Sequence, residues 1–409
     1  MNKNAFSRAY IVLPVLSIVF TVFLASCAPG AASSTSLQVS NQSVAQQVPP
    51  QLQLLHGKTP ALSWIFGRDC QRGVQAYLQS AAADPDLALV GTGWVDPTNG
   101  SLIVGSNNCE ANTHSMDSVV QLAHSKGGMA YLTITMETEG PGAWTYQQAA
   151  AYIDKATTNQ GYIDAIVHET VRGNYDGVIM DLEGVDHSYP SIQQLFATYN
   201  QHLWAALQPL HKWYGIALIP KISDNENVKY LNAFQDWHLL AHAADFIVIM
   251  AVDQSYHTPG PSVSLAWLKQ LLAYAIQSMP NMLPNIIWEL PLYGDSWHWE
   301  NTDWVYDNQI TYQDAQNIVQ QLTPAQIDTS ASNLQDIYEP HIVYTDTSGV
   351  NHSLWFPTPR SLYTIITGFW EALQEEPQFG NNRLEIAVWW RTTQEPHDFW
   401  PLLDTLYRS

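Results

Sequence analysis

Two carboxylates with strand spacing are the clearest chemical signal in this 409-residue sequence. The apolar run Gly177-Val-Ile-Met-Asp181 is followed by Leu182 and Glu183. Side chains alternate along a β-strand, so Asp181 and Glu183 would point to one side and Leu182 to the other. Like charges held that close raise at least one pKa, which keeps a carboxyl group protonated near neutral pH. The pair therefore predicts a proton-transfer site at the end of a strand.

Eight short apolar and β-branched runs follow Pro60, most of them separated by amphipathic helical stretches. They begin at Ala61, Leu87, Met129, Gly177, Gly215, Phe246, Asn285 and Leu384. Alternating strands and helices predict an α/β fold with a parallel sheet, and eight such units are the number in a closed (β/α)8 (TIM) barrel. Because catalytic groups of such barrels lie at the carboxyl ends of the strands, we expect the site there.

The spacing of the runs breaks once, between the seventh and the eighth. The excess lies at about residues 297–361 and contains an expected helix over 312–321 and short strands near 342–344 and 353–356. We therefore expect a small α+β insertion between strand 7 and strand 8 of a barrel that spans residues 58–409.

The amino-terminal residues 1–26 have the pattern of an export signal. Two cations precede an apolar run from Tyr10 to Ala25 that ends in Leu24-Ala-Ser-Cys27. This ending resembles the lipobox of bacterial lipoproteins, which implies cleavage before Cys27 and lipidation of its thiol. A chance cysteine after a plain signal peptide and an uncleaved membrane anchor remain alternatives.

Residues 27–57 are dominated by Ser, Gln, Ala and Pro, a composition that buries too little apolar surface to fold. We expect this segment to be a flexible tether from the lipidated cysteine. The predicted location is extracytoplasmic, with lipid anchoring to the cell membrane or envelope.

Charge and composition exclude some partners. The chain has 16 Lys and Arg against 37 Asp and Glu, so its formal net charge is −21. Binding to a phosphate backbone requires clustered cations, so we expect no nucleic-acid partner. We also expect the chain to be a monomer. The 16 Trp and 20 Tyr residues suit sugar faces and apolar clefts as well as core packing.

Two cysteines, Cys70 and Cys109, follow the tether. An even number in an exported domain favours a disulfide between them, although two buried free thiols remain the alternative. The sequence contains no His-Glu-x-x-His, Gly-rich phosphate loop or Gly-x-Ser-x-Gly motif, so we expect neither a metal nor a cofactor.

The segment 174–185 resembles the Asp-Gly-x-Asp-x-Asp-x-Glu motif on the fourth barrel strand of glycoside hydrolase family 18. Asp176 and Gly177 match its start, Asp181 its third acid and Glu183 its terminal proton donor, whereas Ile179 replaces the middle acid. The branch that resembles spore-cortex-lytic N-acetylglucosaminidases also lacks the middle Asp. Further similar segments are 219–224, 245–253, 259–261, 290–294 with Trp297, 354–356 with Ser361, and 389–391.

The resemblance implies a retaining glycosidase whose nucleophile is the 2-acetamido group of the substrate itself. Glu183 would protonate the glycosidic oxygen, and Asp181 would hydrogen-bond the acetamido N–H. The implied substrate-binding residues are Asp176, Asp253, Tyr256, Tyr293, Trp297, Trp389 and Trp390, of which Trp389 or Trp390 would form the floor of the subsite.

Structural roles compete with several of these assignments. Asp176 belongs to an Asp-Gly pair that is common in turns. Asp253 suits a loop hydrogen bond as well as a substrate contact, and Tyr293 and Trp297 suit core packing. Lys221 is expected at the surface or the barrel rim.

Two functions follow from these observations. The first is a surface-anchored glycosidase that hydrolyses N-acetylglucosamine-containing glycans, either peptidoglycan or chitin-like. The alternative is a non-catalytic glycan-binding lipoprotein on the same barrel, because Ile179 replaces an acid and Val252 replaces a strand-six Tyr of the family. In the family that strand-six Tyr would hydrogen-bond the reacting acetamido group of the substrate. In the first case Tyr256 or Tyr293 would have to make this hydrogen bond. An envelope assembly or adhesion protein is supported only by the anchor and the tether.

Overall fold

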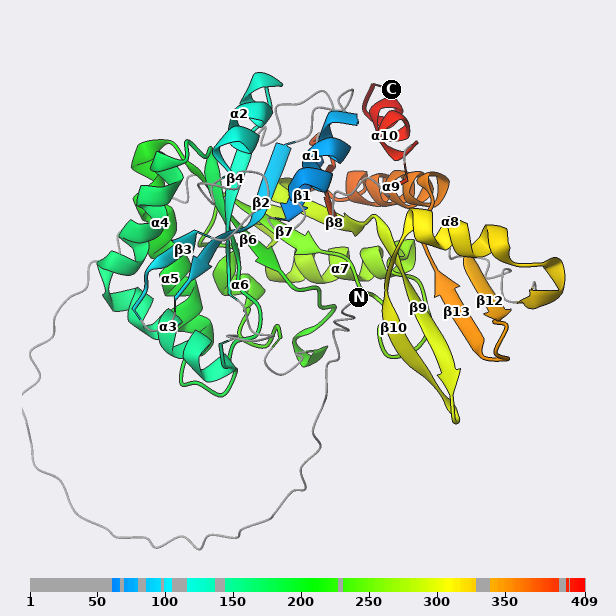
Figure 1. Cartoon of the computed structure of the whole chain (residues 1–409). Helices are drawn as coiled ribbons and strands as arrows, with labels where there is room; N and C mark the ends of the chain where they lie inside the picture. Colours follow the sequence, from blue (N-terminus) through cyan, green and yellow to red (C-terminus); the bar gives the residue numbers. More distant parts are fainter. Residues whose placement is uncertain are drawn as a thin grey trace, which may run out of the picture. The chain divides into compact units, whose positions relative to one another are not determined.

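The computed structural model in Figure 1 describes part of the compact unit that spans Pro50–Ser409. The described residues are 61–66, 70–79, 86–96, 99–104, 116–136, 144–226, 231–328, 339–389, 395–396 and 398–408. The predicted signal sequence and the predicted tether lie outside them, as do Cys27, Cys109 and Trp390. Among the described residues, none of the helices has the length and apolar character needed to cross a membrane.

Eight parallel strands form the main sheet within the described residues. They are β1 (Ala61–Phe66), β2 (Asp86–Val95), β4 (Ala130–Thr135), β5 (Gly177–Asp181), β6 (Trp213–Leu218), β7 (Phe246–Met250), β8 (Ile286–Pro291) and β14 (Glu385–Trp389). Their order is β1-β14-β8-β7-β6-β5-β4-β2, and β1 also pairs in parallel with β2. Each strand thus has a parallel neighbour on both sides, which is consistent with a TIM-like fold. The short β3 (Leu102–Val104) adds to β2 in antiparallel orientation.

Helices connect the strands as the sequence pattern predicts (Figure 1). They are α1 (Cys70–Gln79), α2 (Asp117–Ser125), α3 (Tyr146–Thr158), α4 (Gln160–Arg172), α5 (Ile192–Leu207), α6 (Trp237–Leu240), α7 (Leu265–Ser278) and α9 (Pro359–Gln374), and α10 (Phe399–Arg408) follows the last strand. Local chemistry defines their starts. In α9, for example, the Thr358 side chain accepts the Ser361 backbone N–H while the Ser361 side chain accepts the Thr358 N–H, a capping box that satisfies two free donors.

The core has two layers that follow strand alternation. Val178 and Met180 of β5 pack in the large cluster beneath the helices. Ile179 points the other way, into an inner cluster made by the opposite faces of the strands. That inner cluster consists of Leu62, Trp64, Tyr131, Ile179, Ala217, Phe246, Val248, Ile287 and Ala387. The side of β5 that carries Asp181 is therefore the side that faces the inner cluster.

A second, antiparallel sheet lies between β8 and α9 in the sequence. Its strands are β9 (Tyr293–Glu300), β10 (Asp303–Thr311), β11 (Ile327–Asp328), β12 (His341–Thr345) and β13 (Asn351–Trp355), in the order β10-β9-β13-β12-β11. Helix α8 (Tyr312–Gln321) packs on this sheet through Ala315. The sheet begins earlier than the expected start near residue 297, because β8 continues into β9 with only Leu292 between them.

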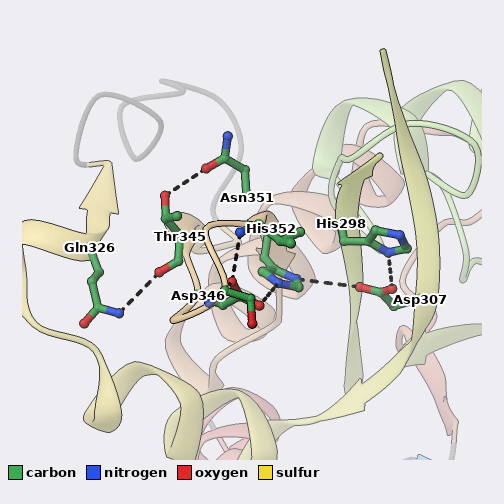
Figure 2. Close-up of polar contacts among 9 residues, drawn as sticks. His298, Asp307, Gln326, Thr345, Asp346, Asn351 and His352 are labelled. Atoms are coloured by element: carbon green, nitrogen blue, oxygen red, sulfur yellow. Dashed lines mark hydrogen bonds and ion pairs between the residues drawn. The ribbon is translucent and has the colours of Figure 1, made fainter. Parts of the chain in front are cut away.

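The turn that joins β12 to β13 is built around one aspartate. Asp346 Oδ1 accepts the backbone N–H groups of Ser348 at 2.9 Å and Val350 at 2.8 Å. Its other oxygen contacts His352 Nε2 at 3.4 Å, as Figure 2 shows. These contacts, first of all the Val350 N–H, lower the pKa of Asp346. The Asp346 carboxylate thus accepts backbone N–H groups of the turn that would otherwise hydrogen-bond to water.

Candidate active site

Asp181 and Glu183 lie together at the carboxyl end of β5. Asp181 is the last residue of the strand, and its Oδ1 is buried and has no hydrogen-bond partner in the structure. Burial raises the pKa of Asp181 well above its usual value, and the charge of the half-buried Glu183 raises it further. A buried carboxyl oxygen without a partner is costly unless a ligand meets it. The pair is therefore placed and perturbed as a proton-transfer site requires.

Glu289 is a third carboxyl group that the sequence analysis missed. It lies on β8, two residues after the inward-facing Ile287, and is 2% exposed. Burial raises its pKa, and the charges of Asp181, Glu183 and Asp253 raise it further. The sequence feature that could have identified Glu289 is that it is an acid inside the otherwise apolar run Ile286–Pro291. Three strand ends thus bring carboxyl groups close enough to influence one another.

Asp253 follows β7 and is held by a tyrosine. Tyr293, at the start of β9, is buried and donates its hydroxyl to Asp253 Oδ1 at 2.5 Å. Asp253 has φ of 57°, in the left-handed region that aspartate tolerates better than most residues. Burial, and then the charge of Asp253, raises the pKa of Tyr293. Tyr293 therefore orients Asp253.

Asp295 forms a second polar group beside Asp253. It is 2% exposed and accepts hydrogen bonds from Ser262 Oγ at 2.7 Å and Tyr306 Oη at 2.9 Å. Burial, and then the charge of Asp253, raises the pKa of Asp295 to about 7, while the two hydrogen bonds oppose the rise. Sequence spacing gave no signal for this group, because its members come from β9, β10 and the segment before α7.

The other expected aromatic contact residues within the described part of the chain are either half-buried or fully buried. Tyr256 is half-buried and packs on the Tyr306 ring with centroids 4.5 Å apart. Trp297 is fully buried and donates its indole N–H to the Tyr256 carbonyl at 3.1 Å, so it supports the loop that carries Tyr256. Trp389, the last residue of β14, is half-buried and packs edge-on against Trp64 at 6.0 Å.

Asp176 does not lie at the site, so its expected substrate contact is wrong. It precedes β5, and therefore lies at the amino end of the strand while Asp181 lies at the carboxyl end. Its Oδ2 accepts the Ala130 backbone N–H at 2.8 Å and contacts His124 Nε2 at 2.8 Å. Asp176 thus ties the start of β4 to α2, which is a structural role.

Lys221 also differs from expectation. Its side chain is buried, and its Nζ donates to the Gln235 carbonyl at 2.9 Å. Burial lowers its pKa, while the charge of Asp224 opposes the change. Lys221 therefore stabilises the loop after β6 from inside.

Cys70 is buried at the start of α1 and takes part in a disulfide. Cys109, its predicted partner, lies outside the described residues, so the pairing stays a prediction. Among the described residues, no three His, Cys, Asp or Glu side chains are grouped as metal ligands.

Fold and site together define a parallel α/β protein of TIM-like fold with interacting carboxyl groups at the carboxyl ends of its strands. No family model matches the chain. The spore cortex-lytic enzyme SleL of Bacillus cereus has a similar structure, with a TM-score of 0.67 and 19% identity, over 84% of this chain and 73% of that one. A chitinase from Chromobacterium violaceum has a TM-score of 0.65 and 18% identity, over 84% and 98%.

One curated relative is similar in sequence. YdhD of Bacillus subtilis strain 168, whose name describes it as a sporulation-specific glycosylase, is 24% identical over 233 residues. The match covers 56% of this chain and 52% of YdhD, so the chain spans about half the length of the curated relative that it matches. The likeness to the solved structures shows the fold that this chain shares with them.

Proposed function

We propose that the protein is a glycoside hydrolase of the family 18 type that cleaves N-acetylglucosamine-containing glycans. The main support for this proposal is the Asp181–Glu183 pair at the end of β5, in which a buried oxygen of Asp181 has no hydrogen-bond partner and could bind a ligand. Two structural neighbours, a spore cortex-lytic enzyme and a chitinase, support the same substrate class. The pairing of β1 with both β14 and β2 supports a closed (β/α)8 barrel as the scaffold.

The proposed reaction uses the two carboxyl groups in different roles. Glu183 donates its proton to the glycosidic oxygen as the bond from that oxygen to C1 breaks, and the acetamido carbonyl oxygen of the same sugar attacks C1. Asp181 accepts the acetamido N–H and stabilises the positive oxazolinium ion. Water then attacks C1 and gives a proton back to Glu183 while the bond from C1 to the acetamido oxygen breaks, so the product retains its configuration.

The position of the other groups suits binding of the sugar. Asp253 is fixed by Tyr293 and is exposed, so its carboxylate lies where a substrate hydroxyl or amide can reach it. Tyr293 donates its hydroxyl proton to Asp253. Tyr256 is therefore the better candidate to hydrogen-bond the acetamido group of the substrate, which Val252 cannot do. The half-buried Trp389 offers a ring beside the inner cluster as the floor of the subsite.

A second candidate is a glycan-binding protein without turnover. It is favoured by Ile179, which is fully buried in the inner cluster where the family motif has an acid. Under either function we propose that lipidated Cys27 anchors the chain outside the cytoplasm through the tether, and that it acts as a monomer.

One experiment separates the two candidates. The full chain is incubated with chitooligosaccharides and with purified peptidoglycan, and the products are identified by mass spectrometry. New reducing ends that disappear with Glu183→Gln support the hydrolase. Binding without any product, for both substrates, supports the glycan-binding protein.

A further inference from the structure

Glu289 lies on the inner face of the main sheet, directly above the apolar inner cluster. It follows the cluster member Ile287 by two residues, so both side chains point to the same side of β8. Its register neighbours are Met250 on β7 and Ala387 on β14, and neither carries a strong hydrogen-bonding group. Among the described residues, the buried Oε2 of Glu289 has no hydrogen-bond partner. A buried acid oxygen without a partner is costly, so Glu289 needs an explanation beyond packing.

Asp181 has the same placement on β5. It follows the cluster member Ile179 by two residues, and its buried Oδ1 also has no partner in the described part of the chain. Because Ile179 is the next residue below it on the same face, β5 itself offers no polar side chain there. On β4, Thr135 lies opposite Asp181, and its Oγ1 is unpartnered as well. Two carboxyl groups and one hydroxyl therefore lie at the strand ends with unmet hydrogen-bonding capacity.

The charges around Glu289 favour its neutral form. Burial raises the pKa of Glu289 first, and the negative charge of Asp181 raises it next, while Trp64 on β1 opposes the rise. The titratable groups that act on Glu289 or respond to it come from the end of β5, the segment after β7 and the start of β9: Asp181, Glu183, Asp253 and Tyr293. A carboxyl group surrounded by these acids and by apolar side chains keeps its proton.

The proposed reaction requires the opposite state of Asp181. Asp181 has to carry a charge to stabilise the oxazolinium ion, yet burial raises its pKa and so favours the neutral form. A buried carboxylate is stabilised when a hydrogen-bond donor reaches it. A carboxylic acid that stays protonated is such a donor, and its proton is more acidic than that of the Thr135 hydroxyl.

We propose that Glu289 is a positioning residue of the proposed reaction: it stays a neutral acid and donates a hydrogen bond to Asp181, directly or through one bridging water, so that Asp181 can carry its charge. This inference rests on the proposed glycosidase function for the role of Asp181. The proton of Glu289 stays on its own oxygen throughout the reaction, and Glu289 acts through Asp181 without touching the substrate.

The pH dependence of turnover separates a hydrogen-bond donor from a side chain that only fills space. The full chain is assayed on chitooligosaccharides, and the acid limb of kcat/KM reports the ionisation of Asp181. Glu289→Leu removes the donor, so Asp181 should hold its proton to higher pH and the acid limb should move up by about one unit, which is about a tenfold loss below the limb. Glu289→Gln keeps an N–H donor of nearly the same shape, so its acid limb should stay close to that of the wild type.

Two further variants make the assignment specific. Glu371→Leu, on the exposed face of α9, is the matched control and should leave the profile unchanged. Thr135→Val removes the other unpartnered group beside Asp181 and keeps its shape, and it should move the acid limb less than Glu289→Leu does. Thermal unfolding of each variant reports its folding.

A double-mutant cycle tests the same contact without turnover. Urea unfolding near neutral pH is compared for the wild type, Glu289→Leu, Asp181→Asn and the double variant. If Glu289 donates to a charged Asp181, Glu289→Leu should shift the urea midpoint further toward destabilisation in the wild type than in the Asp181→Asn background.

Several outcomes would overturn the inference. An acid limb that Glu289→Leu leaves in place, or that moves only with Thr135→Val, would show that Glu289 is not the donor. A Glu289→Gln profile that moves to lower pH would show that Glu289 is charged in the working range. Equal midpoint shifts in the two backgrounds would exclude the contact with Asp181.

Failure of this inference is distinguishable from failure of the hydrolase proposal. A non-additive cycle in a chain that never cleaves glycan would support the contact between Glu289 and Asp181 while the hydrolase proposal fails. Turnover that is lost with Glu183→Gln but is insensitive to Glu289→Leu at every pH would support the hydrolase while this inference fails.

Discussion

At the residue scale, Glu183 is the proposed proton donor. Glu183→Gln keeps the size of the side chain but removes the transferable proton, so we expect turnover to fall about 10²–10⁴-fold. Glycan binding and unfolding stability should change little. Steady-state kinetics on chitooligosaccharides check this, with Glu371→Gln on the exposed face of α9 as a matched control. Full activity of Glu183→Gln would refute the assignment.

Asp181 has a different predicted signature. Its charge is proposed to stabilise the oxazolinium ion, so Asp181→Asn should lower kcat more than it raises the Kd of an uncleaved oligosaccharide. Because burial raises the pKa of Asp181 in the folded protein, the neutral amide should also be tolerated in the fold. Comparing kinetics with calorimetric binding separates the two effects. An equal loss in both would instead assign Asp181 to ground-state binding.

At the element scale, Asp295 links β9 to β10 and to the segment before α7. Its folded pKa of about 7 lies above the ~3.9 of an unfolded aspartate, so the folded state binds more protons between these values. Asp295 therefore contributes to the free energy of unfolding at low pH. This contribution, about 4 kcal/mol at most, is lost as pH rises from about 4 to 7.

Asp295→Asn should remove this dependence. Urea unfolding at pH 4.5 and pH 7.5 measures it: the wild type should lose more stability than the variant over this interval. Asp303→Asn, at an exposed position of β10, is the control and should follow the wild type. Parallel pH dependence in wild type and Asp295→Asn would show that Asp295 ionises normally.

At the scale of the whole molecule, the fold places its proposed chemistry at one end of the sheet, while the amino-terminal lipobox is proposed to attach the chain to a membrane. Cys27→Ser should release the chain from membranes or block processing, since no lipid can then be attached. Membrane fractionation and intact mass measure this. An unlipidated wild-type chain that begins at another residue would contradict the anchor.

The sequence by itself determined the local features of this protein. Alternation along 177–183 predicts that Val178 and Met180 point away from Ile179, and the two core clusters contain them in that way. Helices α5 and α7 lie between strand-forming runs, as the alternation of strands and amphipathic stretches predicts. These features depend on neighbouring residues alone, which is why a sequence pattern can predict them.

Only the tertiary structure decided which distant residues act on one another. The charge of Asp181 raises the pKa of Glu289 although β5 and β8 are far apart in the sequence. Asp295 has a pKa of about 7 because other segments of the chain bury it. Asp176 matches the family motif, yet the direction of β5 places it at the far end of the strand. Burial and charge act through space, and distances across the sheet are set by its pairing and not by spacing along the chain.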